Sequence, residues 1–301
     1  MKYIITGGSG LIGRKLCELL VREGHIVYVL SRSPDTIAMP QGVTVIKWDA
    51  KTGRGWGGLV ENVDAIVNLA GENIGSGRWS AKKKEKILRS RLNASEAILD
   101  ALKMSEKKPR LLIQASAVGY YGTNLEKAFT EKDVAGNDYL SQLALEWEQS
   151  TQPVEEFGVS RIVIRTGVVL SPRGGVLKQM VLPFKLFVGG SLGSGKQWIS
   201  WIHEEDEVRA IYFLLQSENI SGTFNLTSPN PVTNAEFERA LAKTIHKPYW
   251  FPVPGFMIKA LFGEMSMLVV DGQKVMPEAL LKRGFAFKYL ELESALSDIL
   301  S

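Results

Sequence analysis

The sequence predicts an α/β protein, with a doubly wound parallel sheet of the Rossmann type followed by a second, smaller C-terminal α/β domain. Three observations lead to this prediction. The first thirteen residues have the pattern of a strand, a glycine-rich turn and the start of a helix. Strand-like and helix-like segments then alternate as far as residue 170. Beyond it, prolines and glycines break the alternation, so the expected domains are residues 1–170 and 171–301.

The stretch at residues 2–13 has the layout of a dinucleotide-binding turn. A β-branched and aromatic run, KYIIT at residues 2–6, is typical of a buried strand and leads through glycines into a helical pattern. Gly7 permits the tight turn, Gly10 lets the backbone approach phosphate oxygens, and Gly13 lets the helix lie close to the strand. The helix N-terminus offers N–H groups and a positive dipole end to a pyrophosphate. The residues predicted to hold it are Thr6, Gly7, Gly10, Leu11, Ile12 and Gly13.

The end of the second expected strand, residues 26–30, bears on the choice of cofactor. An Asp or Glu there would hydrogen-bond the ribose 2′-hydroxyl of NAD. This chain has Ser31 and Arg32 instead, a hydroxyl and a fixed cation suited to a 2′-phosphate, which favours NADP(H). A third strand is expected at residues 43–48, with Asp49 at its end, where an adenine edge would be contacted.

The alternation continues to residue 170. A fourth strand at residues 64–70 runs into Gly71, and a long helix follows at residues 80–104. The Arg89 and Arg91 side chains of this helix either reach cofactor phosphates or face water, and spacing alone does not choose between these. A fifth strand at residues 110–116 ends in Ser116. A helix at residues 139–149 and a sixth strand at residues 161–170 complete the series.

Parallel strands joined by right-handed crossovers bring ligand-binding residues to one edge of the sheet, at the carboxyl ends of the strands. The residues expected at or near those ends are Gly7, Arg32, Asp49, Gly71, Ser116 and Gly167. After residue 170, residues 222–227 resemble a strand that rejoins the sheet. A helix is expected at residues 233–245, with Thr233 or Asn234 as its cap and Glu236 in its first turn.

Composition excludes several classes of protein. The 36 basic and 32 acidic residues leave a net charge of +4, too mild and too scattered to favour nucleic acid or an anionic membrane. Cys17 is the single cysteine, so an intramolecular disulfide and a cysteine metal cluster are excluded, and Cys17 is expected to be a packed side chain. No metal site is predicted. The chain begins directly with a strand, so we expect no signal peptide and a cytoplasmic location.

With these segments in view, the chain resembles the extended short-chain dehydrogenase/reductase superfamily, and more closely its atypical branch of epimerase family proteins, which is similar to NAD-dependent epimerases and dehydratases and carries a C-terminal domain of unknown function. The segments that carry the resemblance are TGGSGLIG at 6–13, SR at 31–32, NLAGENI at 68–74, RTGVVLSPRGG at 165–175, GSGKQWISWIH at 193–203 and DGQKV at 271–275. The resemblance implies a Rossmann domain that binds NADP(H) and a smaller domain that closes over a substrate cleft. Beside the glycine loop, it implies cofactor contacts from Ser31, Arg32, Leu69, Ala70, Arg91 and Val169.

The catalytic pattern departs from that superfamily. Its enzymes use a Tyr with a Lys four residues later, assisted by Ser or Thr, because a cation on the same helix face lowers the pKa of the phenol. Here Tyr139 is followed by Leu143 at the lysine position. Ser116 remains as a hydroxyl donor toward the substrate oxygen. The proton donors left open are Tyr139, Tyr120, Tyr121 and water.

The C-terminal segment departs as well, because Ile199 stands where nucleotide-sugar enzymes carry an Arg that grips the diphosphate. We therefore expect an NADP(H)-dependent oxidoreductase or oxidation–reduction epimerase with a small, polar substrate that the sequence does not name. Gln197, Trp198, Trp201 and His203 are candidates for the substrate side, although Trp201 fits the core and His203 a structural role equally well. The alternative is a non-catalytic NADP(H)-binding sensor or partner-binding protein.

Overall fold

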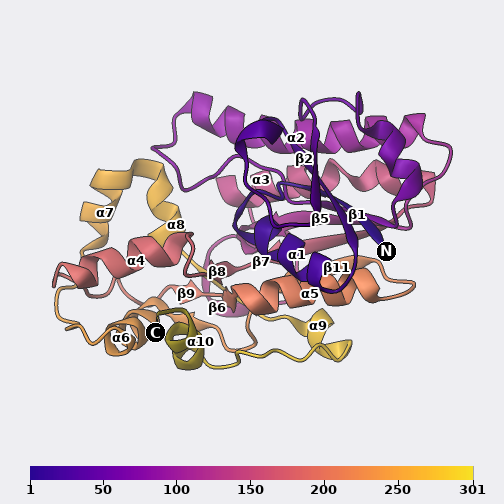
Figure 1. Cartoon of the computed structure of the whole chain (residues 1–301). Helices are drawn as coiled ribbons and strands as arrows, with labels where there is room; N and C mark the ends of the chain where they lie inside the picture. Colours follow the sequence, from indigo (N-terminus) through magenta and orange to yellow (C-terminus); the bar gives the residue numbers. More distant parts are fainter. Residues whose placement is uncertain (301) are drawn as a thin grey trace.

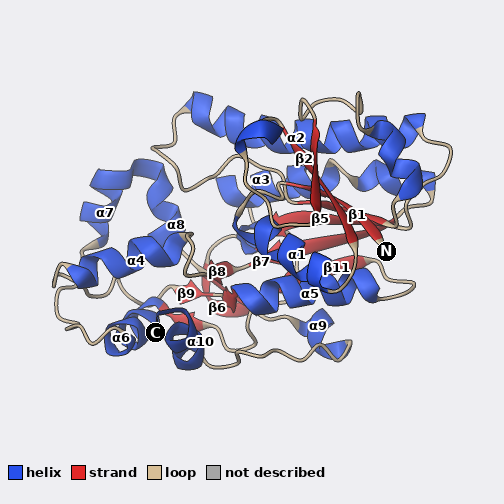
Figure 2. Ribbon diagram, in the orientation of Figure 1, coloured by secondary structure: helices blue, strands red, loops and turns tan. Residues whose placement is uncertain are grey.

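The computed structural model describes residues 1–300 and is built around a sheet of seven parallel strands (Figures 1 and 2). Their order is β11-β7-β5-β4-β1-β2-β3. The chain begins in the middle, builds outward to β3, and then returns past β1 to build the other half, which confirms the predicted doubly wound topology. The strands are β1 (Lys2–Thr6), β2 (Ile26–Ser31), β3 (Val43–Lys47), β4 (Ala65–Asn68), β5 (Leu111–Ala117), β7 (Ser160–Thr166) and β11 (Gly222–Leu226).

Helices cover both faces of this sheet (Figure 2). On one face lie α1 (Leu11–Arg22) and α5 (Glu204–Gln216), and on the other α2 (Ala81–Met104) and α3 (Tyr139–Gln149). Neighbouring residues of β1 point to opposite faces, so Ile5 packs in the core beneath α1 and Ile4 in the core beneath α2. Cys17 belongs to the first core, and burial raises the pKa of its thiol to about 12, as expected of a packed side chain.

The strand expected at residues 161–170 is interrupted at Gly167, and its second part leaves the sheet as β8 (Val168–Leu170). The Gly167 N–H still donates to the Leu226 carbonyl at 3.0 Å, whereas the Val168 N–H donates to the Ser200 carbonyl at 2.8 Å. There β8 pairs with β10 (Trp201–His203). A Cβ on Gly167 would lie 2.3 Å from the Ser200 carbonyl oxygen, so this crossing of two backbones requires glycine.

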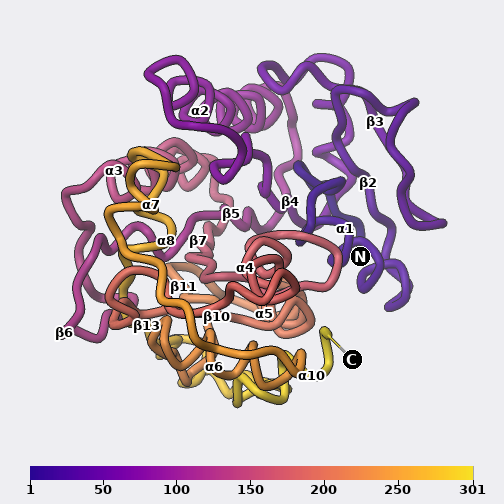
Figure 3. Tube along the Cα trace, turned by 90° about the vertical axis from the view of Figure 1, so that its left-hand side faces the viewer, coloured from indigo at the N-terminus to yellow at the C-terminus, as the bar shows by residue number. Residues whose placement is uncertain are grey.

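The C-terminal part packs helices around short strand pairs on the lower left of Figure 1. The third hydrophobic core of the molecule lies in this part and includes Trp201, Phe237 and Leu296. Figure 3 shows α10 beside α6. The capping box between Thr233 and Glu236 confirms the expected start of α6. The remaining elements are β6 (Asn124–Phe129), α4 (Val176–Lys185), β9 (Trp198–Ile199), β12 (Val232–Thr233), α6 (Asn234–Thr244), α7 (Gly255–Phe262), α8 (Met267–Val270), β13 (Gln273–Val275), α9 (Glu278–Lys282) and α10 (Leu292–Leu300).

Residues after position 170 complete the core of the cofactor-binding part. α5 packs on α1, and β11 pairs with β7 as the edge strand of the main sheet. Ile202, Ile211 and Leu226 share one buried cluster with Ile5 and Leu16. The chain therefore leaves the sheet after β7 and re-enters it at β11. None of the helices within residues 1–300 combines the length and the apolar character needed to span a bilayer.

Candidate cofactor and substrate site

The glycine loop lies where the chain reverses its direction of sheet building, between the ends of β1 and β4. Gly7 has φ +68°, and a Cβ there would lie 2.6 Å from the Leu69 carbonyl oxygen. A Cβ on Gly13 would lie 2.4 Å from the Gly7 carbonyl oxygen and 2.6 Å from the Gly8 Cα. The loop, the first turn of α1 and the segment Leu69–Ala70 are thus packed backbone against backbone, which is the close approach that a pyrophosphate site needs.

Thr6 and the start of α1 have different roles in this loop. The Thr6 hydroxyl donates to Asn68 Oδ1 at 2.6 Å and accepts from the Ala70 N–H at 3.2 Å, so it joins the ends of β1 and β4. The N-cap of α1 is Gly10, and within residues 1–300 no side chain caps this helix. The first-turn N–H groups at Leu11 and Ile12 therefore lack a side-chain acceptor, a condition that fits an anionic cofactor phosphate.

The end of β2 presents Arg32 to solvent. Ser31 is buried, and its hydroxyl accepts from the Ser33 N–H at 3.1 Å. Arg32 is exposed and, across the described residues, forms no ion pair or side-chain hydrogen bond. Asp49 is also exposed, but its carboxylate accepts from the N–H groups of Lys51 and Thr52, both at 2.8 Å, and these bonds hold its pKa below the usual range. The Asp49 carboxylate thus stabilises its own turn, and these hydrogen bonds do not direct it toward an adenine, the contact expected of it.

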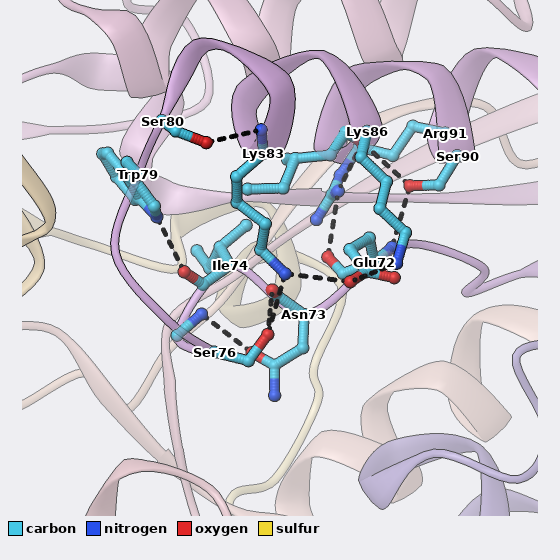
Figure 4. A network of polar contacts seen from close by, with 12 residues as sticks. Glu72, Asn73, Ile74, Ser76, Trp79, Ser80, Lys83, Lys86, Ser90 and Arg91 are labelled. Atoms are coloured by element: carbon cyan, nitrogen blue, oxygen red, sulfur yellow. Dashed lines mark hydrogen bonds and ion pairs between the residues drawn. The ribbon is translucent and has the colours of Figure 1, made fainter.

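The segment that follows β4 is fastened to α2 by a network of polar contacts (Figure 4). Glu72 pairs with Lys83 at 2.9 Å and Lys86 at 3.1 Å, and its N–H donates to Ser90 Oγ at 2.9 Å. The hydrogen bonds from the two lysines hold the pKa of Glu72 below its usual range. The Arg91 Nη1 donates to the carbonyls of Glu72 and Ile87 at 3.2 and 2.8 Å. The segment beginning at Gly71 is therefore held in place without a ligand.

Arg91 faces the interior rather than water. A Cβ on Gly71 would lie 3.1 Å from its Cζ, and its guanidinium lies over the Trp147 ring, 4.7 Å from the ring centroid. Burial lowers the pKa of Arg91 to about 10, so the group keeps its charge at neutral pH. The Arg91 Nε and Trp147 Nε1 are both buried and have no hydrogen-bond partner within residues 1–300. Two adjacent donors without an acceptor fit a bound cofactor or substrate oxygen.

A pocket of about 480 Å³ lies between the carboxyl ends of β5 and β7 and the C-terminal part. Its volume is in the range of small-molecule sites. From the sheet side it is lined by Arg91, Ala117, Thr166 and Gly167, and from the other side by α4, α6, α7 and α8. Most of the lining side chains are apolar, among them Ile74, Leu143, Met180, Phe184, Trp198, Ile258, Phe262 and Leu268.

Ser116 does not reach this pocket. Its hydroxyl donates to Glu148 Oε1 at 2.6 Å, and Glu148 forms a two-pronged ion pair with Arg165 at 2.8 and 2.9 Å. Because side chains alternate along a strand, the pocket is lined by the next residue, Ala117. We therefore correct the expected role of Ser116: it is a buried partner of Glu148, and the pocket wall carries a methyl group instead of its hydroxyl.

Tyr120 and Tyr121 belong to the same buried cluster around Arg165. The Tyr121 hydroxyl accepts from Arg165 Nη1 at 3.0 Å and donates to Asn225 Oδ1 at 2.6 Å, and burial raises its pKa to about 12. The Tyr120 ring lies against the Arg165 guanidinium, 3.3 Å from Cζ to the ring centroid. Neither ring lines the pocket. Both are therefore packing residues, which corrects the expectation that Tyr120 is a catalytic phenol.

Tyr139 lies beside the pocket in an apolar cluster. Its ring packs edge-on to Trp79 at 5.0 Å, with the Lys84 Nζ 4.6 Å from its centroid. Its hydroxyl is buried without a hydrogen-bond partner within the described chain. Burial raises the pKa of Tyr139, and the opposing effect of Arg91 is smaller. Leu143, at the position of the usual lysine, lines the pocket. The phenol is thus not prepared as a base at neutral pH.

The sequence matches two known family models. Residues 3–227 match the model of the NAD dependent epimerase/dehydratase family. The chain belongs to this family. Residues 253–299 match a second model, a domain of unknown function, so the resemblance inferred from the sequence is confirmed. As a member of the epimerase branch of the short-chain dehydrogenase/reductases, the chain is an NAD(P)-binding protein.

Relatives of this epimerase family cover the whole chain. The epimerase family protein YfhF of Bacillus subtilis is 41% identical over 302 residues, spanning 100% of this chain and 98% of that protein. A Staphylococcus aureus epimerase family protein, SAR0825, is 38% identical over 302 residues, with 100% and 99% covered. The crystal structure of human epimerase family protein SDR39U1 with NADPH superposes with a TM-score of 0.87 and 31% identity, covering 99% of both chains.

The structure decides among the alternatives that the sequence left open for the substrate side, and it adds one residue. Trp198 lines the pocket as expected, whereas Trp201 is fully buried in the C-terminal core. His203 caps α5, accepting from the Glu205 N–H at 3.1 Å, and is structural. Glu238, which the sequence did not single out, lines the pocket from α6 although it is 1% exposed. A glutamate on the apolar side of a helix would have been the signal for it.

Proposed function

We propose that this chain is an NADP(H)-dependent oxidoreductase whose substrate enters the pocket between the two parts of the molecule. The observation that carries the proposal is the pocket itself, which is about 480 Å³ and continuous from the ends of β5 and β7 to the C-terminal helices. The space at the strand ends is open, although Trp198 stands at its wall. A cofactor-binding module without chemistry needs no such chamber.

The preference for NADP(H) rests on Arg32. It stands at the end of β2, is exposed, and has no competing partner in the described part of the chain. A free guanidinium at this position suits a 2′-phosphate, and it replaces the acidic residue that would favour NAD. The human relative whose structure contains NADPH supports the same choice.

Replacing Arg32 with Asp is expected to remove most of the preference for NADPH over NADH. A hydrogen bond to a charged group contributes about 1.5–3 kcal/mol, so NADPH affinity should fall by roughly 10- to 150-fold. Fluorescence titration of the protein with NADPH and with NADH measures both affinities. Arg22→Asp is the matched control, because Arg22 is also an exposed arginine, at the far end of α1, and it should leave the preference unchanged. Equal affinity of the unmodified protein for both cofactors would exclude the proposal.

The chain's own residues suggest how the reaction is arranged. Bound at the strand ends, a nicotinamide supplies or accepts the hydride. Arg91 and Trp147 offer two donors to an oxygen in the pocket, and Ala117, Val168 and Leu143 give it apolar walls. Tyr139 is the remaining phenol beside the pocket, but its raised pKa and apolar surroundings make it a poor proton carrier. We therefore assign the proton to water that enters with the substrate.

Tyr139→Phe is accordingly expected to change kcat by less than about tenfold, because a phenol that is not poised for transfer contributes little general acid–base catalysis. Single-turnover oxidation of bound NADPH, followed by nicotinamide absorbance, measures the rate. Tyr120→Phe serves as the matched control, since that ring packs on Arg165 outside the pocket. A loss of about a thousandfold in Tyr139→Phe would contradict the assignment and would show that Arg91 replaces the missing lysine.

A non-catalytic NADP(H)-binding protein is the second candidate. The observation that favours it is the chemistry of the wall, where Ala117 and Leu143 occupy positions from which a hydroxyl or a cation would serve catalysis. The two functions differ in turnover. A screen of carbonyl compounds against the NADPH-loaded protein that yields tight cofactor binding and no oxidation of NADPH would favour the sensor.

A further inference from the structure

The inner part of the pocket has an unusual charge pattern. Of the described residues that line the pocket, Arg91 alone is an Arg or a Lys. It lies on the sheet side, where it donates to two backbone carbonyls and stacks on Trp147. The C-terminal side offers two carboxyl groups, Glu238 and Asp271. A diphosphate or a carboxylate in that region would be desolvated without a cation to pair with, which is costly.

Apolar side chains continue from the pocket to its mouth. Val188, Leu261 and Phe262 line the pocket and are nevertheless 50%, 63% and 42% exposed. Further exposed apolar residues lie on α4, directly after it and on α7: Leu182, Leu186, Phe187, Phe256 and Met257. Figure 1 shows α7 lying above α4 on the left of the molecule. An exposed apolar patch of this kind marks a route or a binding surface for apolar material.

Glu238 is a buried carboxyl group within this region, which Gln179 and Asp271 also line. It lies on α6, one turn after Asn234, and both line the pocket. The Asn234 Oδ1 accepts from the Leu192 N–H at 2.9 Å, and the Asn234 side chain hydrogen-bonds the Glu238 carboxyl, which lowers the pKa of Glu238 by less than burial raises it. The Glu238 Oε2 is buried and has no hydrogen-bond partner within residues 1–300. Burial raises the pKa of Glu238 to about 8, so the carboxyl is neutral at pH 7 and carries a proton that it can donate.

We propose that the substrate is a neutral, lipophilic molecule with a polar group, whose hydrocarbon body fills the apolar chamber and whose polar group is met by the Glu238 carboxyl. This inference rests on the proposed function and names its substrate class. It replaces the expectation of a polar substrate. It also disfavours nucleotide sugars, because the C-terminal side of the chamber, among the described residues that line it, offers two carboxyl groups and no Arg or Lys. The unpartnered Glu238 oxygen then has a role, since a buried polar group requires a partner.

The test measures binding of a neutral solvatochromic dye, Nile red, to the NADPH-loaded full chain, and its displacement by 2-decanone, n-decane and UDP-glucose. Both lipophilic compounds should displace the dye, and 2-decanone should bind more tightly than n-decane. UDP-glucose should not displace it. Met180→Trp fills the chamber and should weaken 2-decanone binding at least tenfold. Lys178→Trp, at an exposed position of the same helix that does not line the pocket, is the matched control and should leave 2-decanone binding unchanged.

The role of Glu238 has its own readout. Glu238→Leu should weaken 2-decanone about three- to tenfold while leaving n-decane unaffected, since a single hydrogen bond is lost, and Glu238→Gln should restore the ketone because the amide also donates. Displacement by UDP-glucose, or a Met180→Trp variant that binds 2-decanone normally, would overturn the inference. NADPH titration of the same samples separates the two proposals: cofactor binding without 2-decanone binding refutes the substrate class alone, and absence of cofactor binding refutes the proposed function.

Discussion

Replacing Arg165 with Met is expected to lower the free energy of unfolding by about 3–5 kcal/mol, the cost of leaving one partner of a buried ion pair uncompensated. Arg165 is 4% exposed on β7, and Glu148 is 8% exposed on α3. Without the guanidinium, the Glu148 carboxylate keeps the Ser116 hydroxyl as a donor but loses two charged hydrogen bonds. Tyr121 loses a donor as well. Chemical denaturation followed by tryptophan fluorescence measures the effect.

The design of this experiment separates the pair from the individual side chains. The double variant Arg165→Met, Glu148→Leu removes both charges, so it should recover most of the lost stability. Lys282→Met is the control: Lys282 pairs with Glu278, the two side chains are 64% and 42% exposed, and solvent screens that pair. If the single Arg165 variant were as stable as the parent, or the double variant less stable than the single one, the assignment would fail.

Gly13→Ala is expected to weaken NADPH binding by at least about tenfold and to destabilise the fold by about 1–3 kcal/mol. The added Cβ would lie 2.4 Å from the Gly7 carbonyl oxygen and 2.6 Å from the Gly8 Cα. Both atoms belong to the backbone, so a rotamer change cannot relieve the clash. α1 must move away from β1, and the loop that faces the phosphates must move with it. Fluorescence titration of NADPH and thermal unfolding of the same sample report the two effects.

Gly58→Ala provides the control for that substitution. Gly58 lies in the short helical turn before β4, and an added Cβ has no atom of the described chain within 4 Å. Its NADPH affinity and its unfolding temperature should match those of the parent. NADPH affinity that survives Gly13→Ala unchanged would show that the glycine loop does not hold the cofactor phosphates.

Local patterns predicted the frame of the molecule well. The strands at β1, β2, β4 and β5, the glycine turn and the capping box of α6 follow from side-chain period and turn chemistry, and each lies within a few residues of its expected place. These features depend on neighbours in the sequence. The parallel arrangement of the strands could be predicted because short, right-handed crossovers allow few sheet topologies.

The site was harder to predict because it depends on contacts between distant segments. Whether Ser116 or Ala117 faces the pocket depends on which side of β5 the substrate chamber lies, and that side is set by α4, α7 and α8. The ion pair between Glu148 and Arg165 joins a helix to a neighbouring strand, and the spacing of the two residues in the sequence does not predict it. In the sequence, Glu238 looks like an ordinary helical glutamate. Its burial beside the pocket depends on segments distant in the sequence, since α4 and β9 line the same pocket.

The return of the chain to β11 sets limits on how this protein can be divided. A fragment that stops at residue 170 would expose the backbone edge of β7, which β11 normally pairs, and the apolar face of α1, which α5 normally covers. Such an unpaired edge invites pairing with other chains. The cofactor-binding unit is therefore not a contiguous module that a shuffled or truncated gene could carry alone.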